Sequence, residues 1–148
     1  MKELYEIGFV FRGFVLLSKT FKESPAQKEH NISKDLRGAF ISAINAFADT
    51  AFNSNSIEYL ESGNILFIFK MAEVQSEDNF TQESLILYGL VDKSKKKSDK
   101  LVKKFFGKVD PMLQLFIQKY NGANFSEINQ FSSFGKIVEE FFIKKQQG

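Results

Sequence analysis

Residues 4–17 read LYEIGFVFRGFVLL, and the pattern in this stretch constrains what the rest of the chain can build. Every second residue from Tyr5 to Phe11 is aromatic or aliphatic, and the residues between them are also largely apolar. Alternation with two apolar faces is typical of a strand that is covered on both sides. The Arg-Gly pair supplies turn chemistry, and a second apolar run follows at once. We therefore predict an antiparallel hairpin over residues 4–21.

Downstream of the hairpin, a polar loop over residues 22–32 precedes a predicted helix over residues 33–52. Three further strands are predicted over residues 57–61, 65–72 and 84–91, with a Ser-Gly-Asn turn between the first two. Apolar residues of the predicted helix recur at spacings of three and four, as on one helix face: Leu36, Phe40, Ala43, Ile44, Phe47 and Ala51.

The C-terminal part of the chain is predicted to be helical, because two apolar stripes with helical spacing run along it. The first stripe comprises Leu101, Phe105, Val109, Met112, Phe116 and Tyr120, and the second comprises Ile128, Phe131, Phe134, Val138 and Phe141. Pro111 removes a backbone donor from the first helix, so we expect a kink or a restart there. Asn121-Gly122 is predicted to cap its end, and Asn124 with Glu127 forms a capping pair for the second helix. The predicted element order is ββαβββαα.

The composition is that of a globular protein, with 43% apolar and 26% charged residues, and the 148 residues suit a single domain, 1–148. Eighteen phenylalanines and no tryptophan allow a dense core that contains few polar atoms. We expect the sheet core to contain Phe9, Phe67, Ile68, Leu87 and Leu90.

Several classes of chemistry are excluded by the residues that are missing. Without cysteine the chain has no disulfide framework, thiolate nucleophile, zinc–cysteine site or iron–sulfur cluster. The single histidine, His30, lies in the polar loop and forms no multi-histidine metal site. Gly8 and Gly13 have the spacing of a phosphate-binding loop, but the required Lys-Ser/Thr pair is missing. We expect no enzyme, no cofactor and no metal; catalysis by lysine, serine and carboxylates is a third hypothesis behind the two given below.

The chain shows no basic region leading into a long apolar stretch and no run of about 18–20 apolar residues. We therefore expect a cytoplasmic protein, with peripheral membrane contact as the alternative location. The net charge of +2 is too small for a protein that binds nucleic acid through its overall charge.

The conspicuous charge feature is residues 93–108, where eight lysines face one acidic residue. One interpretation is a patch for an acidic partner or an anionic membrane, formed by Lys93, Lys95, Lys96 and Lys97. The other is a solvated surface that keeps a phenylalanine-rich domain soluble. No arginine or exposed aromatic is interleaved, so we expect no specific nucleic-acid binding. The acidic segment 73–83 is interpreted as a solvated connection.

In element order and several local sequences, the chain resembles the longin family. The hairpin over 4–21 and the helix over 33–52 are similar to that family's start, and residues 56–60, 65–69 and 85–92 to its three-stranded middle. The resemblance implies a five-stranded antiparallel sheet of order 2-1-5-4-3, with one helix on one face and two on the other. The residues agree with this order, because the first and fifth strands are apolar on both faces.

The resemblance implies a non-enzymatic adaptor of membrane trafficking or small-GTPase regulation. Its partner would be a small GTPase or a second longin- or roadblock-type subunit. We expect the partner to bind at the edge strand and the adjacent helix, through Tyr59, Leu60, Phe40 and Ile44, because an edge strand accepts another strand. Glu58 and Glu61 could equally serve to prevent such pairing. The alternative is a PAS-like sensor that binds a small molecule in a cleft between the second and third strands.

Overall fold

A computed structural model of the chain describes residues 1–23, 38, 41, 43, 58–93 and 96–147, with the backbone alone for Ser62 and residues 144–147. The elements within these residues are β1 (Leu4–Phe11), β2 (Phe14–Thr20), β3 (Tyr59–Ser62), β4 (Ile65–Val74), β5 (Glu83–Asp92), α3 (Ser98–Tyr120), the 3-10 turn η1 (Ile128–Phe131) and α4 (Phe134–Gln147).

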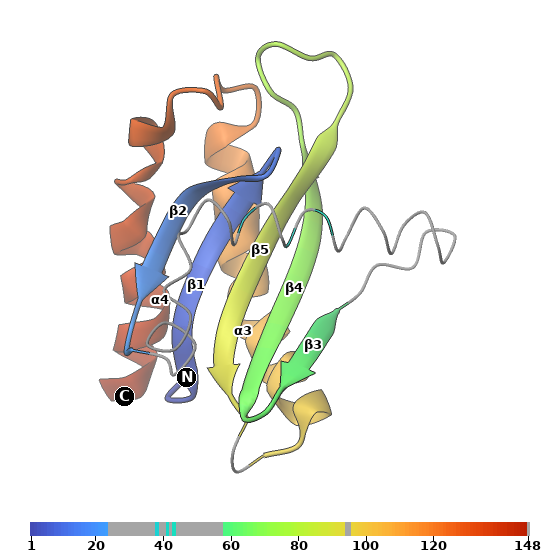
Figure 1. Cartoon of the computed structure of the whole chain (residues 1–148). Helices are drawn as coiled ribbons and strands as arrows, with labels where there is room; N and C mark the ends of the chain where they lie inside the picture. The colour runs from blue at the N-terminus through green and yellow to red at the C-terminus, as the bar shows by residue number, and fades with distance from the viewer. Residues whose placement is uncertain (24–37, 39–40, 42, 44–57, 94–95, 148) are drawn as a thin grey trace.

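The five strands form one antiparallel sheet in the order β2-β1-β5-β4-β3, which confirms the predicted fold class (Figure 1). In the middle of the sheet, Phe9 lies opposite Leu17 on one side and Leu87 on the other. The two central strands, β1 and β5, are buried along almost their whole length. Their apolar residues at both odd and even positions are therefore explained by layers on both faces.

The strand boundaries differ from the predicted ones by a few residues. The turn between β1 and β2 is formed by Arg12 and Gly13, both at positive φ (52° and 81°), as a tight two-residue hairpin requires. The strand predicted over 57–61 runs from Tyr59 to Ser62, and both β4 and β5 extend beyond their predicted ranges. The extensions lengthen the β4–β5 hairpin, so its acidic loop stands beyond the sheet (Figure 1).

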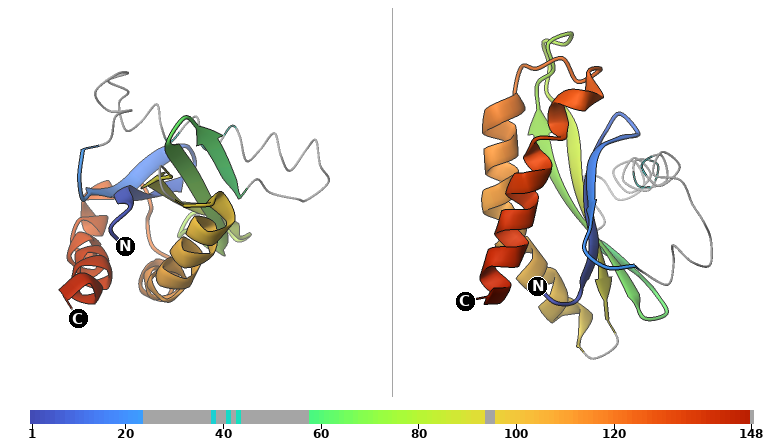
Figure 2. Two further views of the ribbon diagram at one scale, coloured as in Figure 1. Left: turned by 90° about the horizontal axis from the view of Figure 1, so that it is seen from below. Right: turned by 90° about the vertical axis from the view of Figure 1, so that its left-hand side faces the viewer.

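Helices α3 and α4 cover one face of the sheet (Figure 2). Phe116 of α3 is fully buried at the centre of this layer. Its ring stacks on Phe9 with centroids 4.3 Å apart and meets Phe134 of α4 edge-on at 5.2 Å. Aromatic rings in such geometries stabilise one another beyond their buried area. This contact joins β1 to both helices.

On the opposite face, the described part of the predicted helix over 33–52 consists of Gly38, Ile41 and Ala43, all helical. Ile41 is fully buried and packs in one cluster with residues of β1, β4 and β5. A helical segment therefore covers this face, as predicted. The other residues of the predicted helix, Phe40 and Ile44 among them, lie outside the described residues.

The sheet core contains four of the five residues expected there. Phe9, Ile68, Leu87 and Leu90 have no exposed surface, as predicted. The prediction was wrong for Phe67, which is only half-buried. It lies on the face opposite to α3 and α4, toward the β3 edge, where its ring stacks on Phe69 at 5.9 Å.

The two C-terminal elements depart from their predicted form. Helix α3 runs without a restart through Pro111, and Gly107, one turn earlier, is exposed. Pro111 has no N–H to donate to the Gly107 carbonyl, but Gly107 is exposed, so water can replace that donor. Asn121 caps the end of α3 and Gly122 follows at φ 86°, as predicted.

The second predicted helix begins later than expected. The capping pair at 124–127 does not start a helix, because the Asn124 carboxamide accepts a hydrogen bond from the Ser126 amide at 3.1 Å and closes a turn. Gln130 then donates to the carbonyls of Asn124 and Glu127 at 2.5 and 2.9 Å. These contacts hold residues 124–131 as a compact turn that ends in η1, and α4 starts at Phe134. None of the helices in the described residues is long and apolar enough to cross a lipid bilayer.

Candidate functional site

The predicted partner-binding edge is β3, and the structure places Tyr59 and Leu60 in it, both half-buried. Among the described residues no strand lies beyond β3 (Figure 1). Tyr59 packs against the core under α3 and Leu60 against the core of the other face. The two residues therefore point to opposite faces of the sheet. The two helix residues predicted to share this interface, Phe40 and Ile44, lie outside the described residues.

The backbone of β3 has a defined outward face. The Phe69 amide donates to the Glu58 carbonyl at 2.7 Å, so these two opposed residues form a hydrogen-bonded pair. In an antiparallel ladder hydrogen-bonded and non-hydrogen-bonded pairs alternate. Tyr59, opposite Ile68, and Glu61 are therefore in non-hydrogen-bonded pairs. Their N–H and C=O groups point away from β4, toward the edge.

Side chains next to this edge are fixed by contacts with α3 and the segment before it. The Tyr59 hydroxyl lies 3.5 Å from the Asp99 carboxylate, whose charge, together with partial burial, raises the pKa of the hydroxyl. The Glu61 carboxylate accepts hydrogen bonds from Lys93, at 2.5 Å, and from Ser98, and these contacts lower its pKa. Glu61 is thus held by its own chain.

The lysine-rich segment is divided between ion pairs and solvent. Lys93 pairs with Glu61, and Lys96 pairs with Glu3 at 2.6 Å. Lys97 is exposed at the start of α3, and Lys95 lies outside the described residues. When the seven described lysines of 93–108 are counted against Asp99, Glu61 and Glu3, a formal charge of +4 remains. Contact with an anionic membrane or an acidic partner stays a prediction; of the four lysines first assigned to it, Lys97 is the exposed one with no ion pair among the described residues.

Glu3 has a structural role that the sequence pattern did not reveal. Its side chain is only 10% exposed and lies between Lys96 and Lys104, 2.6 and 3.3 Å away. Burial alone would raise the pKa of Glu3, but the hydrogen bond from Lys96 and the charge of Lys104 outweigh it, and the pKa falls to about 2. The carboxylate thus ties the chain before β1 to α3.

We expect Glu3→Gln to lower the free energy of unfolding by about 2–3 kcal/mol at pH 7, because the charged carboxylate is the form that the two lysines stabilise. The folded pKa is lower than the ordinary 4.5, so this stability is present above pH 4.5 and is lost as the pH falls toward 2. Urea unfolding at pH 7, 5, 4 and 3 should show that the difference in unfolding free energy between wild type and variant becomes smaller as the pH falls. Glu73→Gln, at an exposed position of β4, is the control. A difference in unfolding free energy that does not change with pH would contradict this role of Glu3.

At the other end of the sheet, the β1–β2 turn lies below the β4–β5 loop (Figure 1), and the side chain of Arg12 joins the two. Its guanidinium donates to both carboxylate oxygens of Asp78 at 3.1 and 2.9 Å, and to those of Glu83 at 2.9 and 2.6 Å. It also donates to the buried Ser76 hydroxyl at 3.2 Å. The hydrogen bonds from Arg12 lower the pKa of Asp78 to about 2 and that of Glu83 as well. Asp78 in the β4–β5 loop and Glu83 at the start of β5 are thus both bound by Arg12, and we call this group of three residues the clasp. The acidic segment 73–83 is therefore not only a solvated connection.

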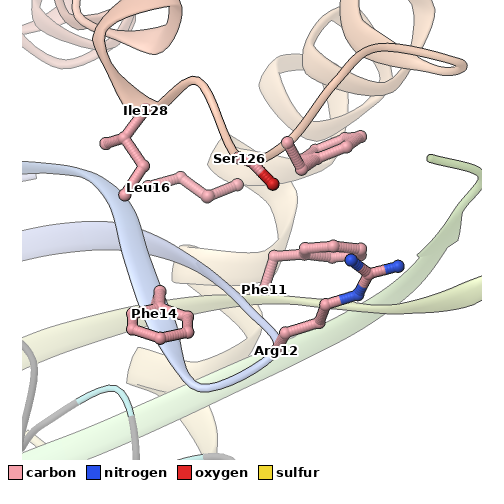
Figure 3. Close-up of a pocket in the computed structure, with 7 residues that line it drawn as sticks. Phe11, Arg12, Phe14, Leu16, Ser126 and Ile128 are labelled. Atoms are coloured by element: carbon pink, nitrogen blue, oxygen red, sulfur yellow. The ribbon is translucent and has the colours of Figure 1, made fainter. Parts of the chain in front are cut away.

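Beside this clasp is a surface hollow of about 300 Å³ that the sequence reasoning missed (Figure 3). We call it the hairpin hollow, because Phe11, Arg12, Phe14 and Leu16 of the β1–β2 hairpin line it. The remaining lining residues are Phe125, Ser126 and Ile128. The sequence held one signal for it. Ile128 begins the second apolar stripe but follows Asn124, a residue that favours turns, by only four positions, and this indicates that Ile128 belongs to a turn and not to a buried helix face.

The described residues contain no cluster of histidine, cysteine, aspartate and glutamate that could hold a metal ion. His30 and most of the chain between β2 and β3, where a PAS-like sensor would form its cleft, lie outside the described residues, so that alternative stays a prediction. A comparison of the chain with protein-family models finds no match, and a comparison with curated proteins finds none either.

Proposed function

We propose that the chain is a non-enzymatic protein-interaction adaptor, similar in role to longin domains of membrane trafficking and small-GTPase regulation. The sheet order is the one that this resemblance implies. The observation that carries the proposal is the backbone of β3, whose groups at Tyr59 and Glu61 point toward the sheet edge. A partner strand can pair with these groups and extend the sheet.

Charge at this edge bears on whether a strand can add there, because charged residues on edge strands often block pairing. Glu58 is exposed, whereas Glu61 is engaged by Lys93 and Ser98 of the same chain. The charge of Glu61 is thus balanced before a partner arrives. The partner we propose is a small GTPase or a second longin- or roadblock-type subunit, bound in the cytoplasm.

We expect Tyr59→Pro to abolish partner binding and to leave the β3–β4 ladder in place, because the lost N–H points to the edge and not to β4. Tyr59→Ala is the matched control, since it loses the same ring but keeps the N–H. Affinity purification from a native lysate, followed by mass spectrometry, should recover the same partner with wild type and Tyr59→Ala only. Backbone NMR spectra of each variant check that the sheet is intact.

Retention of the partner by a folded Tyr59→Pro variant would place the interface elsewhere. Loss with Tyr59→Ala as well would assign binding to the tyrosine ring and not to strand addition. Recovery of a small GTPase would support the regulatory role, and recovery of a longin- or roadblock-type protein would support assembly with a second subunit.

A further inference from the structure

The hairpin hollow combines a buried apolar floor with an exposed apolar rim. Phe11, Leu16 and Phe125 are at most 5% exposed and form the floor, where the rings of Phe11 and Phe125 stack at 4.5 Å. On the rim, Phe14 is 58% exposed and Ile128 43% exposed. Figure 3 shows Leu16 and Ile128 on one side of the hollow and Phe11 on the other. Phe14 and Ile128 thus add exposed apolar surface beside the buried floor, and contiguous exposed apolar surface is a feature of docking sites.

The shape of the hollow is held by contacts that do not depend on a ligand. Arg12 packs over the Phe11 ring, 4.9 Å from its centre, while its guanidinium is fixed by Asp78 and Glu83. On the other side, the turn that carries Ile128 is closed by the hydrogen bonds of Asn124 and Gln130. The floor and both walls are therefore preformed, which lowers the cost of binding.

Among the described residues, the charges beside the hollow are mostly negative. Of the described residues that line the hollow, Arg12 alone is cationic, and its charge is matched twice over, by Asp78 and by Glu83. Glu127 lies between the lining residues Ser126 and Ile128 and is exposed, as is Glu77 next to Asp78. One positive charge against four carboxylates leaves a formal charge of −3 among these residues. An occupant with basic groups beside its apolar part is favoured by this field.

We propose that the hairpin hollow docks a partner protein through one large apolar side chain flanked by lysine or arginine. The volume of about 300 Å³ is at the lower end for small-molecule sites, so it suits one large side chain better than a cofactor. The apolar floor receives that side chain, and the carboxylates at the rim attract its basic neighbours. This surface is distinct from the β3 edge, so it adds a second contact to the proposed adaptor.

The probe is a blocked hexapeptide, Lys-Arg-Leu-Phe-Arg-Lys, titrated into the full chain and followed by backbone NMR. Two matched peptides separate the contributions: one carries glutamate at the four basic positions, and the other carries glycine at the two apolar positions. We expect saturable shifts at Phe11, Leu16 and Phe125 with the first peptide. Each matched peptide should bind at least tenfold more weakly.

Two variants locate the binding on the protein. Ile128→Ser should weaken binding of the Lys-Arg-Leu-Phe-Arg-Lys peptide at least tenfold, because it removes the apolar side chain of Ile128 from the rim of the hollow. Leu115→Ser is the matched control, because Leu115 is equally exposed, at 43%, but lies on α3 and does not line the hollow. Tyr59→Pro should bind the peptide like wild type, so failure of the β3 edge proposal and failure of this one can be told apart.

Four results would overturn the proposal. Equal binding of the glycine peptide would mean that the carboxylates attract any cationic peptide without using the hollow. Equal binding of the glutamate peptide would mean that the partner needs no basic residues, and no binding of any of the three peptides would mean that the hollow does not receive an apolar side chain flanked by basic residues. A self-association seen by sedimentation velocity, lost in Ile128→Ser and kept in Leu115→Ser, would make a second copy of the chain the occupant.

Discussion

Phe116→Ala is expected to lower the free energy of unfolding by about 4 kcal/mol, within the range of about 3–5 kcal/mol for truncation of a buried aromatic residue. The Phe116 ring has no exposed surface and touches the rings of Phe9, Tyr120, Phe131 and Phe134, with centroids 4.3 to 5.8 Å apart. These neighbours come from β1, α3, η1 and α4, so one truncation opens a cavity where four elements meet. A cavity bounded by rigid rings on separate elements collapses poorly, which increases the cost.

The preceding residue provides the matched control for this substitution. Leu115 belongs to the same helix turn but is 43% exposed, so Leu115→Ala should cost about 0.5 kcal/mol or less. Urea unfolding of both variants at pH 7 measures the difference. A cost for Phe116→Ala below about 1.5 kcal/mol would mean that the sheet and the helices pack together without this ring. Since the chain has no tryptophan, tyrosine fluorescence and far-ultraviolet circular dichroism are the suitable signals.

The sheet could be predicted from the sequence because its signals are local. The two apolar faces of residues 4–11, the Arg-Gly pair and the Ser-Gly-Asn turn each depend on neighbours within a few positions. The order of the strands came from the resemblance and from the burial expected of β1 and β5. Residues whose environment depends on the far side of the sheet were less predictable: Phe67 has an apolar pattern but lies on β4 near the edge, where it is half-buried.

The contacts that shape the candidate sites could not be predicted, because they join residues far apart in the chain. Arg12 meets Asp78 and Glu83 across more than sixty positions, and Glu3 meets Lys96 across more than ninety. The distribution of charges along the sequence does not indicate which of these acidic and basic residues form ion pairs. The hairpin hollow likewise needs the β1–β2 hairpin and the turn before η1 to come together. Its one local signal, the turn chemistry at Asn124, was interpreted as a helix start.

Gly8→Ala is expected to lower the free energy of unfolding by about 3 kcal/mol, although alanine normally suits a strand better than glycine. A Cβ atom at Gly8 would lie 2.4 to 2.6 Å from the ring and hydroxyl oxygen of Tyr88, far inside contact distance. Tyr88 is fully buried, and its hydroxyl donates to the buried Glu6 carboxylate at 2.5 Å. The added methyl group therefore forces the ring to move and disturbs a buried hydrogen bond to a carboxylate.

Gly107→Ala separates this steric cost from the general effect of adding a methyl group. No atom lies within 4 Å of a Cβ built at Gly107, and the residue is exposed within α3, so this change should stabilise the protein by about 0.5–1 kcal/mol. A second test shortens the obstructing side chain: in a Tyr88→Leu background the cost of Gly8→Ala should fall to about 1 kcal/mol or less, because the space over Gly8 is open. An undiminished cost in that background would mean that the backbone at residue 8, and not the Tyr88 ring, requires glycine. We expect the ring to be the cause, because the φ of Gly8 is not positive and its conformation is open to any residue.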